Sequence, residues 1–224
     1  ELRLFSRDAT LDGRLIDSRD RLFCRVSSIA DISCIEINES GNPSVSRLSR
    51  DSLALTDSQV VSRVPKSIAV GSNHVCSILG NSDENQLVCW GSNSEGQIGI
   101  DSGLYHTRIH VVEKPQSGIW THVSAGSMHS CAALDNSSLY CWGSNYLGQI
   151  SSTWPTNEPL PVEVIWEGTK PIAQLESGDF HTCIATFDSD VYCWGWNGWG
   201  QLGNGGFTNE GVPSIVDLPS DQEL

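Results

Sequence analysis

Pairs of cysteines recur along this chain at a nearly constant spacing, and each pair lies within a recurring stretch of sequence. The first cysteine of each pair follows its predecessor by 52, 55 and 52 residues. A unit of this length cannot bury both faces of its strands alone, so neighbouring units must stack on one another. The regular period therefore predicts a repeat architecture, whose leading cysteines are Cys24, Cys76, Cys131 and Cys183.

Three of the four copies share the motif His-x-Cys followed by Cys-Trp-Gly-x-Asn-x-x-Gly-Gln, within residues 70–99, 124–150 and 176–203. The first copy is eroded, because Leu22 and Ile35 stand where the other copies have His and Trp. We therefore expect a degenerate first repeat plus a connecting segment over residues 1–63. Residues 64–224 are expected to hold three well-formed repeats and a C-terminal strand, in the same domain.

Short apolar runs on either side of polar turns predict that each repeat is made of strands. In the third copy two such runs flank Asp135 to Ser138, which is a hairpin signal, and in the fourth they flank Asp188 to Asp190. Segments beside proline, at 162–166 and 212–216, are typical of edge strands. Residues 46–61 are the least strand-like stretch. The pattern indicates an all-β protein whose units stack as propeller blades or solenoid rungs.

The motif resembles the regulator-of-chromosome-condensation repeat family, and in particular its cysteine-containing variant from secreted and cell-surface proteins. The resemblance is specific over most of residues 64–203 and weak over residues 12–45. It implies a β-propeller, usually of seven blades, that binds proteins through loops on its faces. Members of the family include an exchange factor for a nuclear GTPase, a β-lactamase inhibitor protein and plant receptor ectodomains.

This chain departs from the family in having about four repeats. A closed four-bladed ring, an open arc, and two arcs that pair into a larger ring remain open, and we favour the open or partial propeller. In such propellers the last blade is often closed by strands from both ends of the chain. We therefore expect the strand-like tail at 211–218 to be able to complete the blade begun at residues 1–23.

The cysteines are expected to form one disulfide within each hairpin. Cys131 and Cys141 are symmetric about their turn, so they lie opposite each other at a separation that permits a disulfide. The expected pairs are Cys24–Cys34, Cys76–Cys89, Cys131–Cys141 and Cys183–Cys193. Reduced core thiols and a metal site are the alternatives, although the close Cys-x-x-Cys pairs that zinc favours are absent from the sequence. Disulfides would place the protein outside the cell, on its surface or elsewhere in the secretory pathway.

The charge of the chain bears on the partners that it can take. The formal net charge is −14; residues 1–63 carry nine arginines and ten acidic residues, whereas residues 64–224 carry three lysines, one arginine and seventeen acidic residues. Such a surface repels phosphate backbones, so no nucleic-acid partner is expected. No apolar run is long enough for direct membrane insertion. The chain begins Glu1-Leu2-Arg3, which suggests a processed protein or a fragment.

Residues that break the repeat are the candidate binding residues. Trp196 and Trp199 replace smaller or polar residues of the other copies in a turn that also contains Asn197, and exposed tryptophan is enriched at binding hot spots. Tyr146 and Leu147 occupy related positions in the third copy and are expected to extend the same patch. Packing of these residues against the next repeat is the alternative.

Residues that recur in every intact copy have a structural explanation. His74, His129 and His181 are expected to hydrogen-bond a neighbouring loop rather than to bind a metal. The motif tryptophans are expected to pack between blades. Two sequons, at Asn136 in a hairpin tip and at Asn38 in a turn, predict N-glycosylation in a secreted eukaryotic protein.

These observations favour a non-enzymatic extracellular protein-binding module whose partner is another protein or a second copy of the chain. No nucleophile elbow, phosphate loop or His-Glu-x-x-His motif is present in the sequence, and no cofactor or metal is expected. Two alternatives remain: a structural subunit of a surface or filamentous assembly, and a carbohydrate-binding module, since tryptophan and asparagine also suit sugars.

Overall fold

A computed structural model describes most of the chain from residue 65 onward and four strands before it. Described are the backbones of Ile16–Arg19, Leu22–Val26, Ile32–Ile37 and Pro43–Leu48, and residues 65–218 except 81–83, 102, 104–105, 152–154 and 169, with the side chains of 106–108 also left out. The motif repeats all fall within this part of the chain.

The described strands form four antiparallel sheets of four strands, and each sheet is one sequence repeat. We call these sheets the first to fourth blades. The first contains β1 (Ile16–Arg19), β2 (Leu22–Val26), β3 (Ile32–Ile37) and β4 (Pro43–Leu48). The second contains β5 (Pro65–Val70), β6 (His74–Gly80), β7 (Asn85–Gly91) and β8 (His106–Val111). The third contains β9 (Trp120–Ala125), β10 (His129–Leu134), β11 (Leu139–Gly143) and β12 (Glu158–Glu163). The fourth contains β13 (Ile172–Ser177), β14 (His181–Thr186), β15 (Val191–Gly195) and β16 (Glu210–Ile215).

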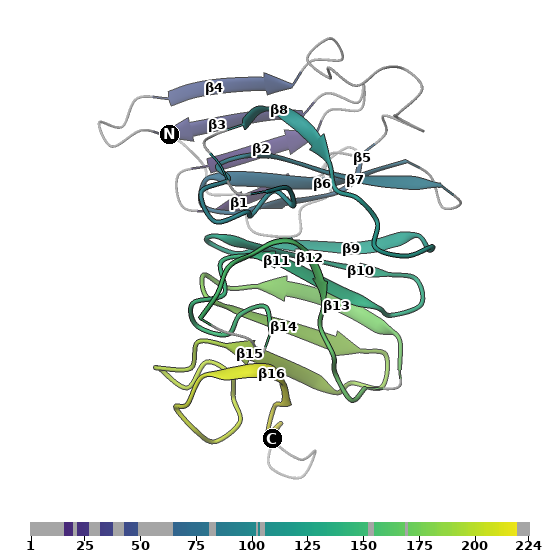
Figure 1. Cartoon of the computed structure of the whole chain (residues 1–224), viewed down its shortest axis with the longest axis vertical. Helices are drawn as coiled ribbons and strands as arrows, with labels where there is room; N and C mark the ends of the chain where they lie inside the picture. The colour runs from purple at the N-terminus through teal and green to yellow at the C-terminus, as the bar shows by residue number, and fades with distance from the viewer. Residues whose placement is uncertain are drawn as a thin grey trace.

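The blades follow one another in chain order, as the colour gradient of Figure 1 shows, with the first and fourth at opposite ends of the molecule. Neighbouring blades touch mainly through their first strands: β5 contacts β1 and β9, and β9 contacts β13. The arrangement confirms the all-β propeller-type fold with about four blades. It is the open row that the sequence favoured, and within the described chain the blades do not close into a four-bladed ring.

The two faces of a blade pack against different neighbours. In β10, Cys131 and Ala133 pack against the fourth blade, whereas Ala132 and Leu134 pack against the second. Side chains alternate between the faces of a strand, so a strand covered on both sides is buried along its whole length. Trp142 is completely buried in the core between the second and third blades. The core of the molecule is therefore a series of interfaces between blades.

The C-terminal strand corrects one expectation from the sequence. β16 pairs with β15 and forms the outer edge of the fourth blade, so the tail completes its own repeat and not the blade begun at residues 1–23. The first blade already has four strands of its own. Short connections favour pairing of consecutive strands, which explains this outcome.

The outer strands also begin earlier than the sequence suggested. They start at Glu158 and Glu210, not at residues 162 and 212, and residues 46–48 belong to β4 instead of a loop. Proline lies within both β12 and β16, in agreement with their place at the sheet edge. No helix long and apolar enough to cross a membrane occurs in the part of the chain that the structure describes.

Candidate binding surface

Disulfides join the two central strands of the second, third and fourth blades. The pairs are Cys76–Cys89, Cys131–Cys141 and Cys183–Cys193, with Cα separations of 4.2, 4.1 and 4.1 Å. In each case the two cysteines are direct partners in the strand register. The three pairings predicted from the sequence are confirmed. The backbones of Cys24 and Cys34 are also direct register partners, but their side chains lie outside the described residues.

A hydrogen-bond network crosses each described interface from the second blade onward. The Nε2 of His74 lies 2.8 Å from the Oγ of Ser130 in the next blade, and that hydroxyl donates to the carbonyl of Gln97 at 2.9 Å. Because the hydroxyl proton points at Gln97, the imidazole donates from Nε2. The indole Nε1 of Trp142 donates to the same carbonyl at 3.0 Å. One loop carbonyl thus receives two donors from the following blade.

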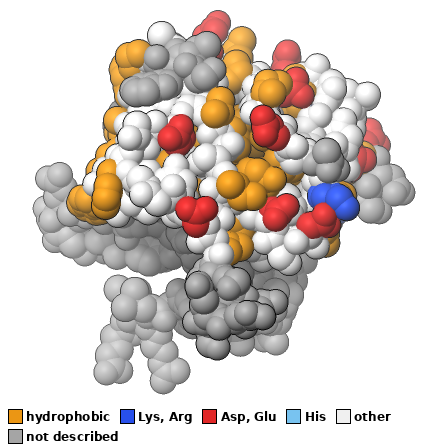
Figure 2. All heavy atoms as spheres, turned by 90° about the horizontal axis from the view of Figure 1, so that it is seen from below, with side chains coloured by type: hydrophobic (Ala, Val, Ile, Leu, Met, Phe, Trp, Pro, Cys, Tyr) orange, Lys and Arg blue, Asp and Glu red, His pale blue; other side chains and the backbone are white. Residues whose placement is uncertain are grey.

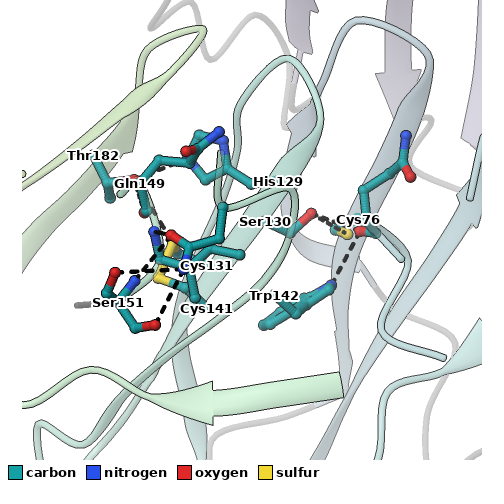
Figure 3. The surroundings of a disulfide bond; sticks show 12 residues. Cys76, His129, Ser130, Cys131, Cys141, Trp142, Gln149, Ser151 and Thr182 are labelled. Atoms are coloured by element: carbon teal, nitrogen blue, oxygen red, sulfur yellow. Dashed lines mark hydrogen bonds between the residues drawn. A yellow bond between two sulfur atoms is a disulfide. The ribbon is translucent and has the colours of Figure 1, made fainter. Parts of the chain in front are cut away.

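The next interface repeats the histidine, hydroxyl and glutamine carbonyl of this arrangement, without the indole contact. The Nε2 of His129 lies 2.9 Å from the Oγ1 of Thr182, whose hydroxyl donates to the carbonyl of Gln149 at 3.5 Å. Figure 3 shows His129, Gln149 and Thr182 on one side of the Cys131–Cys141 disulfide, and Trp142 on the other side near the second blade. The recurring histidines at 74 and 129 therefore connect blades, in agreement with the structural role expected for them.

The motif glycine before each histidine leaves space for the imidazole. A Cβ at Gly126 would overlap the ring of His129, and a Cβ at Gly71 would overlap the ring of His74. Neither glycine has a positive φ. Glycine is required at these two positions because an imidazole ring lies too close for a side chain, and not because the backbone has an unusual conformation.

The turn that contains the two exceptional tryptophans is held rigidly from inside. The Oδ1 of Asn197 accepts the backbone NH of Leu202 at 3.0 Å, and the Oε1 of Gln201 accepts the backbone NH of Trp199 at 2.9 Å. The Asn197 side chain is fully buried and also donates to Asn204 and to the carbonyl of Gly206. Asn197 therefore shapes the turn, which corrects its grouping with the exposed residues.

The aromatic rings of Trp196 and Trp199 are in contact on this turn. Their ring centroids lie 5.0 Å apart, and Trp196 makes an edge contact with Phe180 at 6.2 Å. Trp196 is half-buried, whereas Trp199 is 83% exposed. We call this turn, residues 196–201, the Trp199 loop. Its outermost ring rests on a second ring that the blade itself fixes.

Tyr146 and Leu147 occupy the corresponding turn of the third blade. Tyr146 is exposed and Leu147 is half-buried, and the backbone NH of Leu147 donates to the Oε1 of Gln149 at 2.9 Å. Among the described ring contacts, none joins Tyr146 to the two tryptophans. The continuous patch predicted from the sequence remains a prediction.

The sequon at Asn136 lies at the tip of the β10–β11 hairpin. Asn136 is exposed, and its Oδ1 accepts the backbone NH of Ser138 at 3.0 Å. Ser137 between them has a φ of 67°. The predicted hairpin is confirmed, and the geometry leaves the Asn136 side chain accessible. Asn38 lies outside the described residues.

A groove of about 430 Å³ that the sequence did not indicate lies beside this hairpin. Its walls come from the hairpin tip, the end of the outer strand and the connection to the fourth blade. The ring of Trp166 lines it and makes an edge contact with Tyr192 at 5.6 Å, while Lys170 pairs with Asp188 at 3.0 Å. The lining residues come from two segments that are separate in the sequence, within 135–139 and 163–171, so no local pattern predicts the groove.

Within the described residues, no group of three or more histidine, cysteine, aspartate or glutamate side chains could hold a metal ion. The exposed Trp199 loop is a candidate site because its aromatic surface can be buried against another molecule.

Sequence relatives of this chain are longer proteins. The chain is 27% identical over 159 residues to the ultraviolet-B receptor UVR8 of Arabidopsis thaliana, a match covering 70% of this chain and 35% of that protein. It is 27% identical over 177 residues to the human probable E3 ubiquitin-protein ligase HERC4, covering 79% of this chain and 16% of that protein. The chain thus spans about a third or less of the length of these relatives.

Solved structures share the fold. Human WBSCR16 superposes with a TM-score of 0.72 at 13% identity, covering 92% of this chain and 53% of that one. Yeast RCC1 (Prp20), in a structure with Kap60, superposes with a TM-score of 0.65 at 16% identity, covering 94% of this chain and 63% of that one.

Family models for the Regulator of chromosome condensation (RCC1) repeat match residues 66–97, 120–149 and 172–201, and also residues 136–185 and 188–223. Together these matches cover the first three strands of the second blade, all of the third and fourth blades, and more than half of the chain. The chain belongs to the RCC1 repeat family.

Proposed function

We propose that this chain is a non-enzymatic protein-binding module that works in an oxidising, extracellular compartment and contacts its partner through the Trp199 loop. The observation that carries the proposal is a tryptophan with 83% of its surface exposed on a turn fixed by internal hydrogen bonds. Exposed tryptophan contributes strongly to interfaces when a partner covers it. A turn that is already ordered loses little entropy on binding.

The compartment rests on the disulfides. Three hairpins each carry a cross-strand pair, and such pairs form and persist where thiols are not kept reduced. If the proposal is correct, alkylation of the protein from its native source, unfolded in denaturant but not reduced, will label none of these six cysteines. Labelling of all six would place the protein in a reducing compartment.

Relatives support a binding role and not a particular partner. Yeast RCC1 (Prp20), whose structure shares this fold, was solved with Kap60 bound, so a protein that contains this fold can take a protein partner. HERC4 is named as a ubiquitin ligase, and this chain corresponds to 16% of that protein. The partner of this chain must therefore be identified by experiment.

The test compares Trp199→Ala with Phe187→Ala as a matched control. Both residues are large, apolar and highly exposed, and both belong to the fourth blade, but Phe187 follows β14 and lies outside the Trp199 loop. Partners are captured by cross-linking from the fluid in which the protein occurs, identified by mass spectrometry and produced pure. Their affinity for the parent chain and for each variant is then measured by calorimetry.

We expect Trp199→Ala to weaken binding by roughly 30-fold, the effect of losing a hot-spot residue worth about 2 kcal/mol. Phe187→Ala should leave affinity unchanged, and neither variant should change the melting temperature by more than a few degrees, because both side chains are at the surface. Equal affinity of the parent and Trp199→Ala would reject the Trp199 loop as the binding site. Affinity for an oligosaccharide alone would favour a carbohydrate-binding module.

A further inference from the structure

The sequon at Asn136 and the groove beside the β10–β11 hairpin occupy the same place in the structure. The side chain of Asn136 is exposed, and Asn136 is one of the residues that line the groove. The facing wall comes from the end of β12 and the connection to the fourth blade, within residues 163–171. A sugar attached to Asn136 therefore starts at the wall of the groove.

The turn holds Asn136 in a conformation that can carry a sugar. The Oδ1 of Asn136 accepts the backbone NH of Ser138 at 3.0 Å, so the amide group is held through its oxygen. The hydroxyl of Ser138, which completes the sequon, accepts a hydrogen bond from the Nε2 of Gln116 at 2.7 Å. A sugar on the Nδ2 of Asn136 leaves both hydrogen bonds in place, because neither of them uses this nitrogen.

The groove has an apolar wall that is fixed in position. Trp166 lines it, and the Trp166 ring makes an edge contact with Tyr192 at 5.6 Å. The backbone of Gly168 lies against the same ring, so close that a Cβ there would overlap it. Ile165 also lines the groove and is 75% exposed. The C–H face of a sugar ring can bury this aromatic and aliphatic surface.

The polar groups of the groove suit a neutral ligand with many hydroxyl groups. Asp135 and Glu163 line it with carboxylates, and its lysine, Lys170, pairs with Asp188 at 3.0 Å. Carboxylates accept hydrogen bonds from sugar hydroxyls, whereas they repel an anionic ligand. Figure 2 shows a similar balance over the fourth-blade end, where acidic side chains are scattered and basic ones appear at one place beside acidic ones.

The size of the groove also fits a few sugar residues. Its volume is about 430 Å³. Sites for small molecules in proteins usually measure about 300–1,000 Å³. The groove can therefore hold the base of a glycan, while the outer branches extend into solvent.

We propose that Asn136 carries an N-linked glycan whose first sugars lie in this groove, against Trp166 and Ile165. In the attachment step the Nδ2 of Asn136 displaces the pyrophosphate of a polyprenyl-pyrophosphate-linked oligosaccharide. The bond from sugar C1 to Nδ2 forms, the bond from C1 to the phosphate oxygen breaks, and one amide proton is lost. The secretory pathway supplies this donor, so the inference rests on the extracellular compartment of the proposed function.

Covalent attachment favours this glycan over a free ligand as the occupant. A short tether holds the sugars beside the groove at an effective concentration on the order of millimolar. A contact too weak to retain a free sugar is therefore sufficient. The docked sugars would bridge the hairpin and the connection to β13, where the Oγ of Ser137 already accepts the backbone NH of Ile172 at 3.4 Å.

The test uses the protein from its native source and the full chain secreted from cultured eukaryotic cells. Glycopeptide mass spectrometry first measures the occupancy of Asn136. The second measurement is the rate at which a peptide-N-glycosidase releases the glycan from the native protein, relative to the rate after denaturation. This enzyme must reach the linkage to Asn136, so docked sugars slow it.

We expect Asn136 to be occupied, and native release to be about tenfold slower than release after denaturation. Trp166→Ala should abolish most of this difference without changing the occupancy. Ile165→Ala should abolish part of it, and this exposed position keeps the test valid if Trp166→Ala unfolds the chain. Leu160→Ala is the matched control, because Leu160 is an exposed apolar residue of β12 that does not line the groove.

Hydrogen exchange provides a readout that does not depend on an enzyme. Backbone amides of residues 163–168 should exchange more slowly in the glycosylated chain than in Asn136→Gln, because the docked sugars cover them. Equal exchange would overturn the proposal. Binding of an oligolysine peptide to the glycosylated chain, lost in Trp166→Ala, would also overturn it and assign the groove to a cationic partner.

An unoccupied Asn136 in the protein from its native source would overturn the proposal, as would equal release rates in the parent chain and both groove variants. Intact disulfides together with a bare Asn136 would reject this inference alone and leave the proposed compartment standing. The groove lies at the β10–β11 turn, whereas the Trp199 loop joins β15 to β16, at the opposite end of the strands. Asn136→Gln should therefore leave the Trp199→Ala binding test unchanged.

Discussion

A few residue types at fixed positions connect neighbouring blades. His129 reaches Thr182 across an interface, while Gly126 leaves room for its ring. A buried imidazole is tolerated when its nitrogen donors find acceptors, because an unmatched buried polar group costs about 1–3 kcal/mol. The histidine, the preceding glycine and the hydroxyl of the next blade therefore act as one unit.

Gly126→Ala should destabilise the protein by about 1–3 kcal/mol, because the new methyl overlaps the His129 ring in a packed interior. Urea unfolding measures the free energy. Gly178→Ala is the matched control: its partner His181 is half-buried and has room to move, so the loss should be smaller. The double variant Gly126→Ala/His129→Ala should lose less than the sum of the single changes. If the two losses of unfolding free energy simply add, the His129 ring is not what the methyl group of Gly126→Ala overlaps.

His122 gives a pH dependence to the contact between the third and fourth blades. Its Nε2 lies 3.1 Å from the carbonyl of Ala173 in β13, and burial lowers its pKa below the ordinary value of 6.5, although the bond to Ala173 opposes this shift. A lowered pKa means that the unfolded chain takes up a proton more readily than the native state does.

Stability should therefore be complete above pH 6.5, decrease as the pH falls below 6.5, and level off below the lowered pKa of the folded state. His122→Gln keeps a donor for Ala173 and cannot titrate. Unfolding free energies of the two proteins, measured from pH 7.5 to 4.5, should differ in slope only below pH 6.5. Parallel curves over this range would exclude His122 as the source.

At the scale of elements, the third and fourth blades are four-strand meanders whose two central strands are joined by a disulfide and whose outer strand contains proline. Cys131 and Cys141 face each other across β10 and β11, and the turn between them places Ser137 at positive φ. The outer strand accepts proline because its free edge needs no backbone donor. The disulfide and the turn restrict the conformations open to this hairpin.

Replacing both Cys131 and Cys141 by Ala should cost about 2–3 kcal/mol from the restored entropy of the unfolded chain, since the bridge closes a ten-residue separation. Loss of buried packing adds to this, as both cysteines are fully buried. The matched control is the double variant Cys183→Ala/Cys193→Ala. The disulfide that it removes spans an equal sequence separation but includes the half-buried Cys183, so the loss of unfolding free energy should be smaller. Denaturant unfolding compares the two. Equal costs would mean that burial contributes nothing.

At the scale of the whole molecule, stability is shared among interfaces between successive blades. The third blade is covered on both sides, and the fourth on one side only. In repeat proteins each unit depends on its nearest neighbours, so a unit with one neighbour is the first to open.

Backbone amides in β14 should therefore exchange with deuterium faster than those at the equivalent positions of β10, by at least tenfold under native conditions. Mass spectrometry of peptides from the two strands measures this directly, because each strand has a unique sequence. Similar protection of both strands would show that the fourth blade is not a terminal unit in solution.

The repeat period, the strands and the three described cysteine pairs were predictable because they follow from local patterns. Cys131 and Cys141 are symmetric about a turn, and this symmetry alone makes them neighbours on adjacent strands. The motif by itself carries the resemblance to the family, because it consists of residues a few positions apart. The sequence placed Asn197 among the candidate binding residues without indicating that its side chain is buried, because its hydrogen-bond partners are backbone groups that converge only after the turn has formed.

By itself, the sequence determined the blade: its period, its hairpins, its disulfides and the residues that meet between blades. Only the tertiary structure decided how the blades are arranged, that the C-terminal strand completes its own sheet, and that one face of the fourth blade stays uncovered. The physical reason is the distance along the sequence over which each feature is specified. Local patterns depend on residues a few positions apart, whereas closure of a propeller depends on small rotations between blades that no single repeat encodes.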